Sequence, residues 1–370
     1  MNGSLRVSLI HATCPVGVLL GVACAGGPIG SLHPIANIPP LVIRDTAASD
    51  SVDLTYLGTS GFLIRRDGHA LMTGPFFSNP SFFWHIFLRF RVHQRTGYID
   101  RVFEDTALRE GANQTAAILI GHSHYDHLMD VPYVAEHYAV NARIYGSPTM
   151  GHILAGDTLL HHRTGRLDPF DRVVVIDSPS VGGLHSRGQW YYVADSTMRF
   201  MALKSEHPPN FLWITIAKRN EDRDFKKLPT GAWGWNLGET YAYLIDLLDA
   251  KRQVVFRIYY TDAPARPPLG DAPTDVLGDG HRVDVALICV GNYDRVDAYP
   301  QALIRQLDPR IVVLSHWEDF FRDPALPQQV VWLAATDPLV ARIDSALPPG
   351  ATWLTPRPLA TLRVVRLRSP

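Results

Sequence analysis

Cysteine is scarce in this chain, and charge of neither sign is in excess. Only 3 of the 370 residues are cysteine, and two of them, Cys14 and Cys24, lie in an apolar segment near the N-terminus. Disulfides are therefore not expected to stabilise the folded body, which holds only Cys289. Lys and Arg total 35 against 36 Asp and Glu, for a formal net charge of -1. Without a basic field a nucleic-acid partner is disfavoured, and small-molecule or lipid substrates fit better.

Long apolar runs are also scarce, apart from one near the N-terminus. Residues 7–26 are mostly apolar, follow the basic Arg6 and end in small residues. This pattern is typical of an export signal or lipoprotein leader, predicted here over residues 1–26. Pro15 and Gly17 interrupt the run, so a membrane-spanning helix is not expected. Cys24 offers a position for a lipid anchor, and the alternative is a ragged N-terminal tail.

The leader also predicts location and domain limits. We expect an exported protein, periplasmic or anchored to the membrane as a lipoprotein in a bacterium, or a cytoplasmic protein if the leader is not functional. Residues 27–50 are rich in Pro, Ala and Ser and predict a linker. The remaining residues, 51–370, are numerous and apolar enough to bury a large core, and we expect them to form one folded domain.

Beyond residue 50 the chain alternates between strand and helix patterns. Helices are expected over residues 131–138, 301–307 and 328–343. Strands are expected over residues 54–57, 62–65, 70–73, 116–120, 143–145, 173–176, 190–193, 199–204, 240–247, 254–260, 283–290 and 311–314. The order implies two halves, each a sheet with helices. Packed sheet to sheet with the helices outside, they predict an α/β fold, a four-layer αββα sandwich with functional loops along one edge.

The most informative segment is residues 121–128, Gly-His-Ser-His-Tyr-Asp-His-Leu, which directly follows the predicted strand 116–120. His122 and His124 are two residues apart in extended backbone, so they point to the same side and can share one metal ion. Asp126 and His127 follow on the turn into a helix and can face a second ion. Nitrogen and carboxylate ligands without thiolate suit zinc best, with manganese or iron as alternatives. A histidine-rich surface loop is the disfavoured interpretation.

Two metal ions need more ligands, and three candidates stand at the ends of later predicted strands. His207 would complete one site with the first two histidines, and His316 would join Asp126 and His127 at the other. Asp262 could bridge the two ions. Each of these residues alone could equally be a surface or capping residue, but their shared position at strand ends favours ligation.

With these residues the sequence resembles the metallo-β-lactamase superfamily over about residues 53–321. The resemblance is greatest to the branch that holds N-acylphosphatidylethanolamine-hydrolysing phospholipase D and ascorbate-6-phosphate lactonase. Its marks are residues 56–62 (Tyr-Leu-Gly-Thr-Ser-Gly-Phe), 124–128 and 315–317 (Ser-His-Trp). Residues 72–78 and 290–294 resemble phospholipase D segments more than lactonase segments. The resemblance implies a metallo-β-lactamase fold and a hydrolase.

Hydrolysis by a metal-bridging hydroxide is the chemistry that a pair of zinc ions would supply. In this hypothesis His122, His124 and His207 hold one ion, and Asp126, His127 and His316 hold the other. Asp262 joins the ions and steers the hydroxide, and Asp126 also accepts a proton as the leaving group departs. Asp126 and Asp262 are therefore the predicted catalytic residues.

Three departures from the family pattern bear on the site. Gly74 stands where the family has an aspartate that orients a ligand histidine, so metal affinity is expected to be weaker unless Thr73 or Thr59 substitutes. The family's Gly-Asp-Thr around the bridging aspartate reads Thr-Asp-Ala at 261–263. The basic residues expected after the third histidine are replaced by Pro-Pro-Asn at 208–210. Substrate handling is therefore expected to differ.

Residues 76–88 are rich in aromatic and aliphatic side chains and could accept an acyl chain or touch a membrane surface. The alternative is a helix that packs Phe83, Phe87 and Phe90 into the core. We therefore expect a zinc-dependent phosphodiesterase or phospholipase D-like enzyme acting on lipidic substrates. A lactonase or other small-ester hydrolase is one alternative, and a non-catalytic metal-binding protein is another.

Overall fold

The structure is a computed structural model that describes residues 30–45, 49–80, 91–157, 172–209, 215, 217–331 and 335–368. The predicted leader, residues 1–26, lies outside these residues. So does most of the aromatic segment, because residues 81–90 are not among them. Within the described residues, no helix combines the length and the apolar character that crossing a membrane requires.

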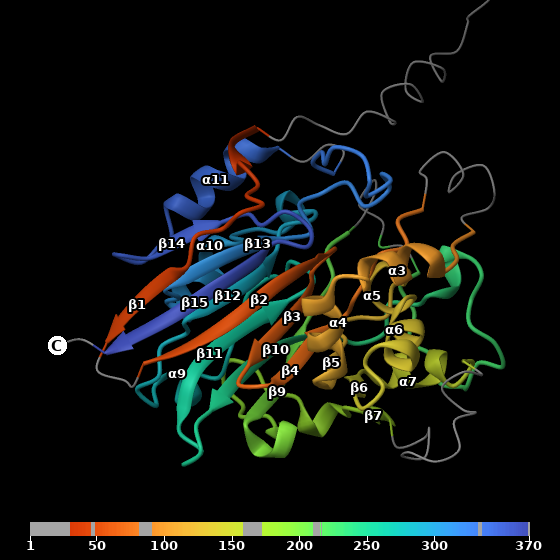
Figure 1. Ribbon diagram of the computed structural model, residues 1–370, viewed down its shortest axis with the longest axis horizontal. Coiled ribbons are helices and arrows are strands. Elements are labelled where there is room, and N and C mark those ends of the chain that lie inside the picture. Colours follow the sequence, from red (N-terminus) through yellow and green to blue (C-terminus); the bar gives the residue numbers. More distant parts are fainter. Residues whose placement is uncertain are drawn as a thin grey trace, which may run out of the picture.

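Two mixed β-sheets form the centre of the molecule (Figure 1). The first has eight strands in the order β1-β15-β2-β3-β4-β5-β6-β7, and the second has seven in the order β14-β13-β12-β11-β10-β9-β8. The first sheet consists of β1 (Leu41–Asp45), β15 (Thr361–Arg368), β2 (Asp50–Gly58), β3 (Gly61–Arg66), β4 (His69–Thr73), β5 (Thr115–Leu119), β6 (Arg143–Gly146) and β7 (Val173–Val175). The second consists of β8 (Tyr191–Val193), β9 (Met198–Ser205), β10 (Thr240–Leu248), β11 (Val254–Thr261), β12 (Val285–Cys289), β13 (Ile311–Ser315) and β14 (Thr352–Leu354).

Strand periodicity explains how the first sheet is covered on both faces. Side chains alternate between faces along a strand, so Leu54 and Ile64 join the core between the sheets, where Tyr243 of β10 also lies. Leu63 and Met72 point the other way, into a second core. Helices α3 (Thr96–Val102), α4 (Thr106–Asn113), α5 (Tyr125–Leu128), α6 (Val131–His137) and α7 (Pro148–Leu154) lie on that side.

The second sheet carries its own helices on the side away from the first sheet. They are α9 (Thr274–Leu277), α10 (Gln301–Leu307) and α11 (Thr336–Asp344). Apolar side chains of these helices, including Ile304 and Ile343, belong to the same core as the strands of the second sheet. Helices therefore flank two face-to-face sheets, as Figure 1 shows, and the predicted four-layer αββα sandwich is confirmed.

Several segments differ from the sequence prediction, and two of them have a clear physical reason. Residues 41–45, expected within a linker, form strand β1, which pairs in parallel with β15 and buries Ile43. The run Leu-Val-Ile supplies the apolar, β-branched side chains that this pairing needs. The helix expected over 328–343 begins only at Thr336, because Val330 bridges to Glu318 and Val331 donates a hydrogen bond to the carbonyl oxygen of Trp317.

Candidate metal centre

The ligand loop leaves the end of β5 at the edge where the strands of both sheets terminate. Tyr243 donates a hydrogen bond from its hydroxyl to the carbonyl oxygen of Ile120, at 2.7 Å. The backbone N–H of Tyr241 donates to the carbonyl oxygen of Gly121, also at 2.7 Å. His124 then takes an extended conformation before α5, so Asp126 and His127 stand on the first turn of that helix. Two buried tyrosines of β10 thus fix the start of the loop against the second sheet.

All seven residues that the sequence predicts as ligands lie together. Their side-chain nitrogen and oxygen atoms form three overlapping groups, and within each group the atoms lie within 4.8 Å of one another. His122, His124 and His207 form the first group. Asp126, His127 and His316 form the second, and Asp262 joins His122 and His127 in a third that links the other two. This is the grouping that the sequence predicts, and metal binding by these residues stays a prediction.

Asp262 lies between the two sets of histidines. Its Oδ1 is 3.1 Å from Nδ1 of His122, and its Oδ2 is 3.7 Å from Nδ1 of His127. The backbone N–H of His122 also donates to Oδ2, at 3.1 Å. A methyl group at Gly121 would collide with the Asp262 carboxyl group. Glycine at this position therefore lets the carboxylate approach the ligand loop closely.

His207 is oriented by the residue that follows it. Its Nδ1 lies 2.6 Å from the carbonyl oxygen of Pro208, and because a carbonyl can only accept, Nδ1 carries the proton. Nε2 is then the nitrogen with a free lone pair, which is the form a metal ligand requires. Pro208 therefore supplies a hydrogen-bond acceptor at the position where the family was expected to have a basic residue.

Unpartnered polar atoms test whether this cluster suits metal ions. Buried polar groups in proteins nearly always form hydrogen bonds. Among the described residues, however, both ring nitrogens of His122 have no hydrogen-bond partner. The same holds for Nδ1 of His127, Nδ1 of His316 and Oδ1 of Asp262. Each neutral imidazole offers a lone pair on one ring nitrogen, so such a concentration of buried, unpartnered atoms fits a pair of divalent cations. The donor set and its arrangement therefore suit the predicted cofactor.

The protonation states follow from burial and neighbouring groups. Burial lowers the pKa of His122 and of His207 well below the usual range, and lowers the pKa of His127 to about 3. Burial alone would raise the pKa of Asp126, but the adjacent His127 and His316 hold it below its ordinary value. His122, His127 and His207 are therefore neutral and Asp126 is ionised, which are the forms that bind metal. His316 differs, because burial alone would lower its pKa but the Asp126 carboxylate holds that pKa above the ordinary value.

Gly74 differs from the family pattern for a steric reason. A side chain at this position would start 2.6 Å from the carbonyl oxygen of His127, so an aspartate could not enter without moving the ligand loop. Thr73 donates its hydroxyl to the carbonyl oxygen of Ser60 and accepts from the N–H of Phe62. Thr59 donates its backbone N–H to Glu318. The described contacts therefore give neither threonine the orienting role. Two carboxylates lie beside the His127 ring: Asp262 is 3.7 Å from Nδ1 and Asp126 is 3.5 Å from Nε2.

Sequence reasoning missed two buried residues beside the cluster, Tyr56 and Glu318. The hydroxyl of Tyr56 accepts a hydrogen bond from the backbone N–H of His316, at 2.9 Å, and donates one to Glu318, at 2.5 Å. Both residues lie within or next to motifs that the sequence analysis quotes, at 56–62 and 315–317. The only indication in the sequence was their position within or next to these motifs. Their contact could not be predicted without knowing how the two sheets pack against each other.

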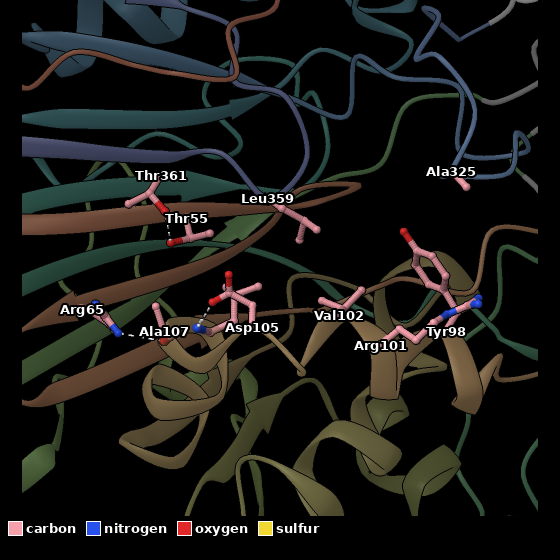
Figure 2. A pocket seen from close by; sticks show the side chains of 11 residues that line it. Thr55, Arg65, Tyr98, Arg101, Val102, Asp105, Ala107, Ala325, Leu359 and Thr361 are labelled. Carbon is pink, nitrogen blue, oxygen red and sulfur yellow. Dashed lines mark hydrogen bonds between the residues drawn. The ribbon is translucent and has the colours of Figure 1, made fainter.

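A cavity of about 510 Å³ lies elsewhere in the molecule (Figure 2). Its walls come from β2, β15, α3 and α4, and one end carries the hydroxyl pair of Thr55 and Thr361, 2.9 Å apart. The side chain of Arg65 at the same end donates to the carbonyl oxygen of Ala107. None of the seven predicted ligands lines this cavity. It is therefore separate from the candidate metal centre.

Comparison with known proteins gives similarity at low identity only. No protein-family model matches the chain, and no curated protein matches its sequence closely. Igni18, a metallo hydrolase from the archaeon Ignicoccus hospitalis, is 16% identical over 85% of this chain and 98% of its own, with a TM-score of 0.47. The metallo-β-lactamase fold protein YhfI from Bacillus subtilis is 11% identical over 85% and 99%, with a TM-score of 0.46.

A third similar structure is CmlA, a diiron β-hydroxylase from Streptomyces venezuelae. It is 15% identical over 86% of this chain and 54% of its own, with a TM-score of 0.46. Identities and TM-scores are low in all three cases, and the two activities that are named, a hydrolase and a hydroxylase, differ. These proteins therefore identify neither the reaction nor the substrate of this chain.

Proposed function

We propose that this chain is a metal-dependent hydrolase of the metallo-β-lactamase superfamily that holds two divalent cations, with zinc as the preferred metal. The observation that carries the proposal is the convergence of seven donor residues, six of them buried, from four distant parts of the sequence, several with atoms that lack a hydrogen-bond partner. If these imidazoles only stabilised the fold, their buried nitrogen atoms would be expected to have hydrogen-bond partners within the protein.

Each ligand group has a defined role in this proposal. His122, His124 and His207 hold one ion, and Asp126, His127 and His316 hold the other, with Asp262 between them. A bound pair of such ions lowers the pKa of water and polarises the bond that is to be cleaved. Asp262 and Asp126 are the catalytic carboxylates. Asp126, ionised by its histidine neighbours, would take up at its carboxylate the proton that the attacking water releases and pass it to the oxygen of the leaving group.

For the substrate we propose a phosphodiester with a lipidic portion, as in a phospholipase D-like reaction. The ring of Phe320 lies 5.0 Å from that of His316, and Phe321 lies 4.3 Å from Phe320. These aromatic rings would offer an apolar wall beside the second ligand group. The resemblance of residues 72–78 and 290–294 to phospholipase D segments supports the same substrate class. Association with a membrane surface follows from it as part of this proposal.

A lactone or other small ester is the second candidate substrate, and one observation favours it. The position after His207 offers the carbonyl oxygen of Pro208 and no cationic side chain. A phosphodiester carries a negative charge that such a position does not compensate. An uncharged ester has no such requirement.

The experiment is a metal analysis followed by a substrate panel. We expect two zinc ions per chain, and turnover of phosphodiesters with acyl chains by zinc-loaded protein. Turnover of lactones alone would replace the preferred substrate with the second candidate. Metal-replete protein that turns over neither class would instead indicate a non-catalytic metal-binding protein.

Asp126→Asn tests the ligand assignment. It should remove one ion and reduce turnover by more than the 10- to 100-fold typical of an outer partner. Asp130→Asn is the matched control, because Asp130 is buried four positions later and belongs to no ligand group. Full metal content and full rate in Asp126→Asn would disprove the assignment.

A further inference from the structure

Two sequence motifs that lie far apart in the chain meet beside the metal centre. The turn between β2 and β3 contacts the segment that follows β13, where His316 stands. The hydroxyl groups of Ser60 and Ser315 are 3.1 Å apart and share a hydrogen bond. The backbone N–H of Thr59 donates to Oε1 of Glu318, at 2.6 Å. These two hydrogen bonds therefore connect the first sheet to the segment after β13 of the second sheet, which carries His316.

The connection to His316 runs through a tyrosine. The hydroxyl of Tyr56 donates a hydrogen bond to Oε2 of Glu318. The oxygen of that hydroxyl also accepts a hydrogen bond from the backbone N–H of His316. Glu318 thus uses one carboxylate oxygen for the turn and the other for Tyr56. Both side chains are almost completely buried, with exposed fractions of 0% for Tyr56 and 3% for Glu318. The arrangement is a closed network without solvent competition.

His316 needs such support because of its backbone conformation. Its φ is +56°, in the left-handed region that favours glycine. A residue held in this region is strained, and surrounding contacts must offset that strain. The conformation places Nε2 of His316 3.5 Å from Oδ2 of Asp126. Gly291 closes the other side, since a methyl group there would lie 3.3 Å from the imidazole ring.

The charge of Glu318 points in the same direction. Among the described residues it forms no ion pair with a lysine or arginine, although its carboxyl group is buried. Burying a carboxylate without a cation is unfavourable, and here hydrogen bonds from Thr59 and Tyr56 stabilise the carboxylate. Because Tyr56 joins Glu318 to the backbone of His316, a divalent cation held by His316 would add a positive charge to the same network.

We infer that Tyr56 and Glu318 are positioning residues that set the metal affinity of the Asp126, His127 and His316 site separately from that of the His122, His124 and His207 site. The inference rests on the proposed metal pair. It goes beyond that pair, because it attributes a difference in metal affinity between the two sites to Tyr56 and Glu318. Among the described hydrogen bonds, these two residues are joined to only one of the seven predicted ligands, His316, through the Tyr56 hydroxyl.

The experiment titrates metal-free protein with Zn²⁺ alone and resolves the two binding steps. In Tyr56→Phe the N–H of His316 loses its acceptor while the ring still fills the same space. We expect the Zn²⁺ affinity of the site that contains His316 to fall 10- to 100-fold, the usual size of the effect when a residue that supports a ligand is lost. The Zn²⁺ affinity of the other site should stay unchanged. At a free Zn²⁺ concentration that fills both sites of the wild type but lies below the dissociation constant of the weakened site, the variant then holds one ion where the wild type holds two.

Glu318→Gln is the second variant, and it keeps the shape of the side chain while it removes the charge. It should weaken the same single site. Tyr299→Phe is the matched control, since Tyr299 is equally buried and its hydroxyl donates to the carbonyl oxygen of Cys289, at 2.6 Å. This control should bind both ions as the wild type does, even if its unfolding temperature falls.

Three outcomes separate the possibilities. Wild-type protein that binds no zinc would contradict the proposed function itself. Wild-type protein that binds two ions while Tyr56→Phe and Glu318→Gln also bind two with unchanged affinity would overturn the positioning role alone. Equal weakening of both sites in these variants would also overturn it, because it would indicate a general effect on the fold.

Discussion

Strand β11 connects two buried polar clusters that differ in how their atoms are satisfied. Beyond its carboxyl end lies Asp262, beside histidines whose ring nitrogens lack partners. Toward its other end lies Arg257, whose side chain is fully buried and whose three guanidinium nitrogens all donate hydrogen bonds. They reach the carboxylates of Asp246 and Asp279 and the carbonyl oxygens of Val276 and His281.

The comparison distinguishes a structural polar cluster from one that expects a ligand. Around Arg257 the chain supplies every donor with an acceptor, so nothing further is needed from outside. Around His122 the chain supplies nitrogen and oxygen atoms that can coordinate a metal ion, but several of them have no hydrogen-bond partner among the described residues. Burial alone would not separate these two regions, but the count of unpartnered atoms does. The two clusters should therefore respond in opposite ways to substitution.

The largest effect is expected from Arg257→Met, which removes one of the two arginines that pair with the buried Asp246 and leaves only Arg199. Removing one partner of a buried pair typically costs about 3–5 kcal/mol, so the free energy of unfolding should fall by that amount. Urea unfolding measures the change, and zinc content of the folded protein should stay at the wild-type value. Arg363→Met is the control, because the Arg363 side chain is 57% exposed and its bidentate pair with Asp53 is expected to contribute at most about 1 kcal/mol. Equal losses in the two variants would contradict the comparison.

A third buried carboxylate, Asp130, lies between the two extremes. One of its oxygens accepts the N–H groups of Phe77 and Ser78, and the other has no partner among the described residues. Burial raises the pKa of Asp130 to about 6, above its ordinary value of 3.8. Between these two pH values the unfolded chain has lost this proton and the folded chain keeps it, so stability should fall as pH rises from about 4 to 6.

Asp130→Asn removes that titration and keeps an acceptor for both N–H groups. Relative to the wild type, the variant should gain on the order of 2–3 kcal/mol of stability between pH 4 and pH 7, since each pKa unit corresponds to about 1.4 kcal/mol. Urea unfolding of both proteins at the two pH values measures this difference, in which the titration of other groups cancels. A constant difference between the two proteins would show that Asp130 titrates normally.

The smallest effect on stability, and the most selective one, is expected from Gly121→Ala. The added methyl group displaces the Asp262 carboxyl group from its place between His122 and His127. Zinc affinity should fall about 10- to 100-fold while the metal-free protein unfolds near the wild-type urea concentration. Gly97→Ala is the control, because a methyl group there meets no atom within 4 Å. A large loss of stability in metal-free Gly121→Ala would mean that the glycine serves the fold first.

The sequence predicted most of the layers and all seven members of the cluster for one physical reason. The ligands stand directly after strands with clear apolar patterns, and strand ends of a sandwich meet at one edge. The prediction failed where partners come from distant segments. Strand β1 reads as a linker until β15 is known to pair with it, and residues 361–368 showed no motif of their own.

The network around His316 was beyond prediction for a related reason. Tyr56 alternates with its neighbours as an ordinary strand residue, and a buried role for Glu318 contradicts the usual exposure of glutamate. Only the contact between the first and second sheets explains both. The position of Gly74 is a further example, because its meaning depends on how closely His127 approaches.

The place of β15 between β1 and β2 has a consequence for biosynthesis (Figure 1). Arg363 and its ion-pair partner Asp53 are 310 positions apart. At ribosomal rates of about 5–20 residues per second, β2 waits roughly 15–60 seconds for this neighbour. During that interval its hydrogen-bonding edge is open to other nascent chains, so this protein is expected to depend on chaperones until translation reaches β15.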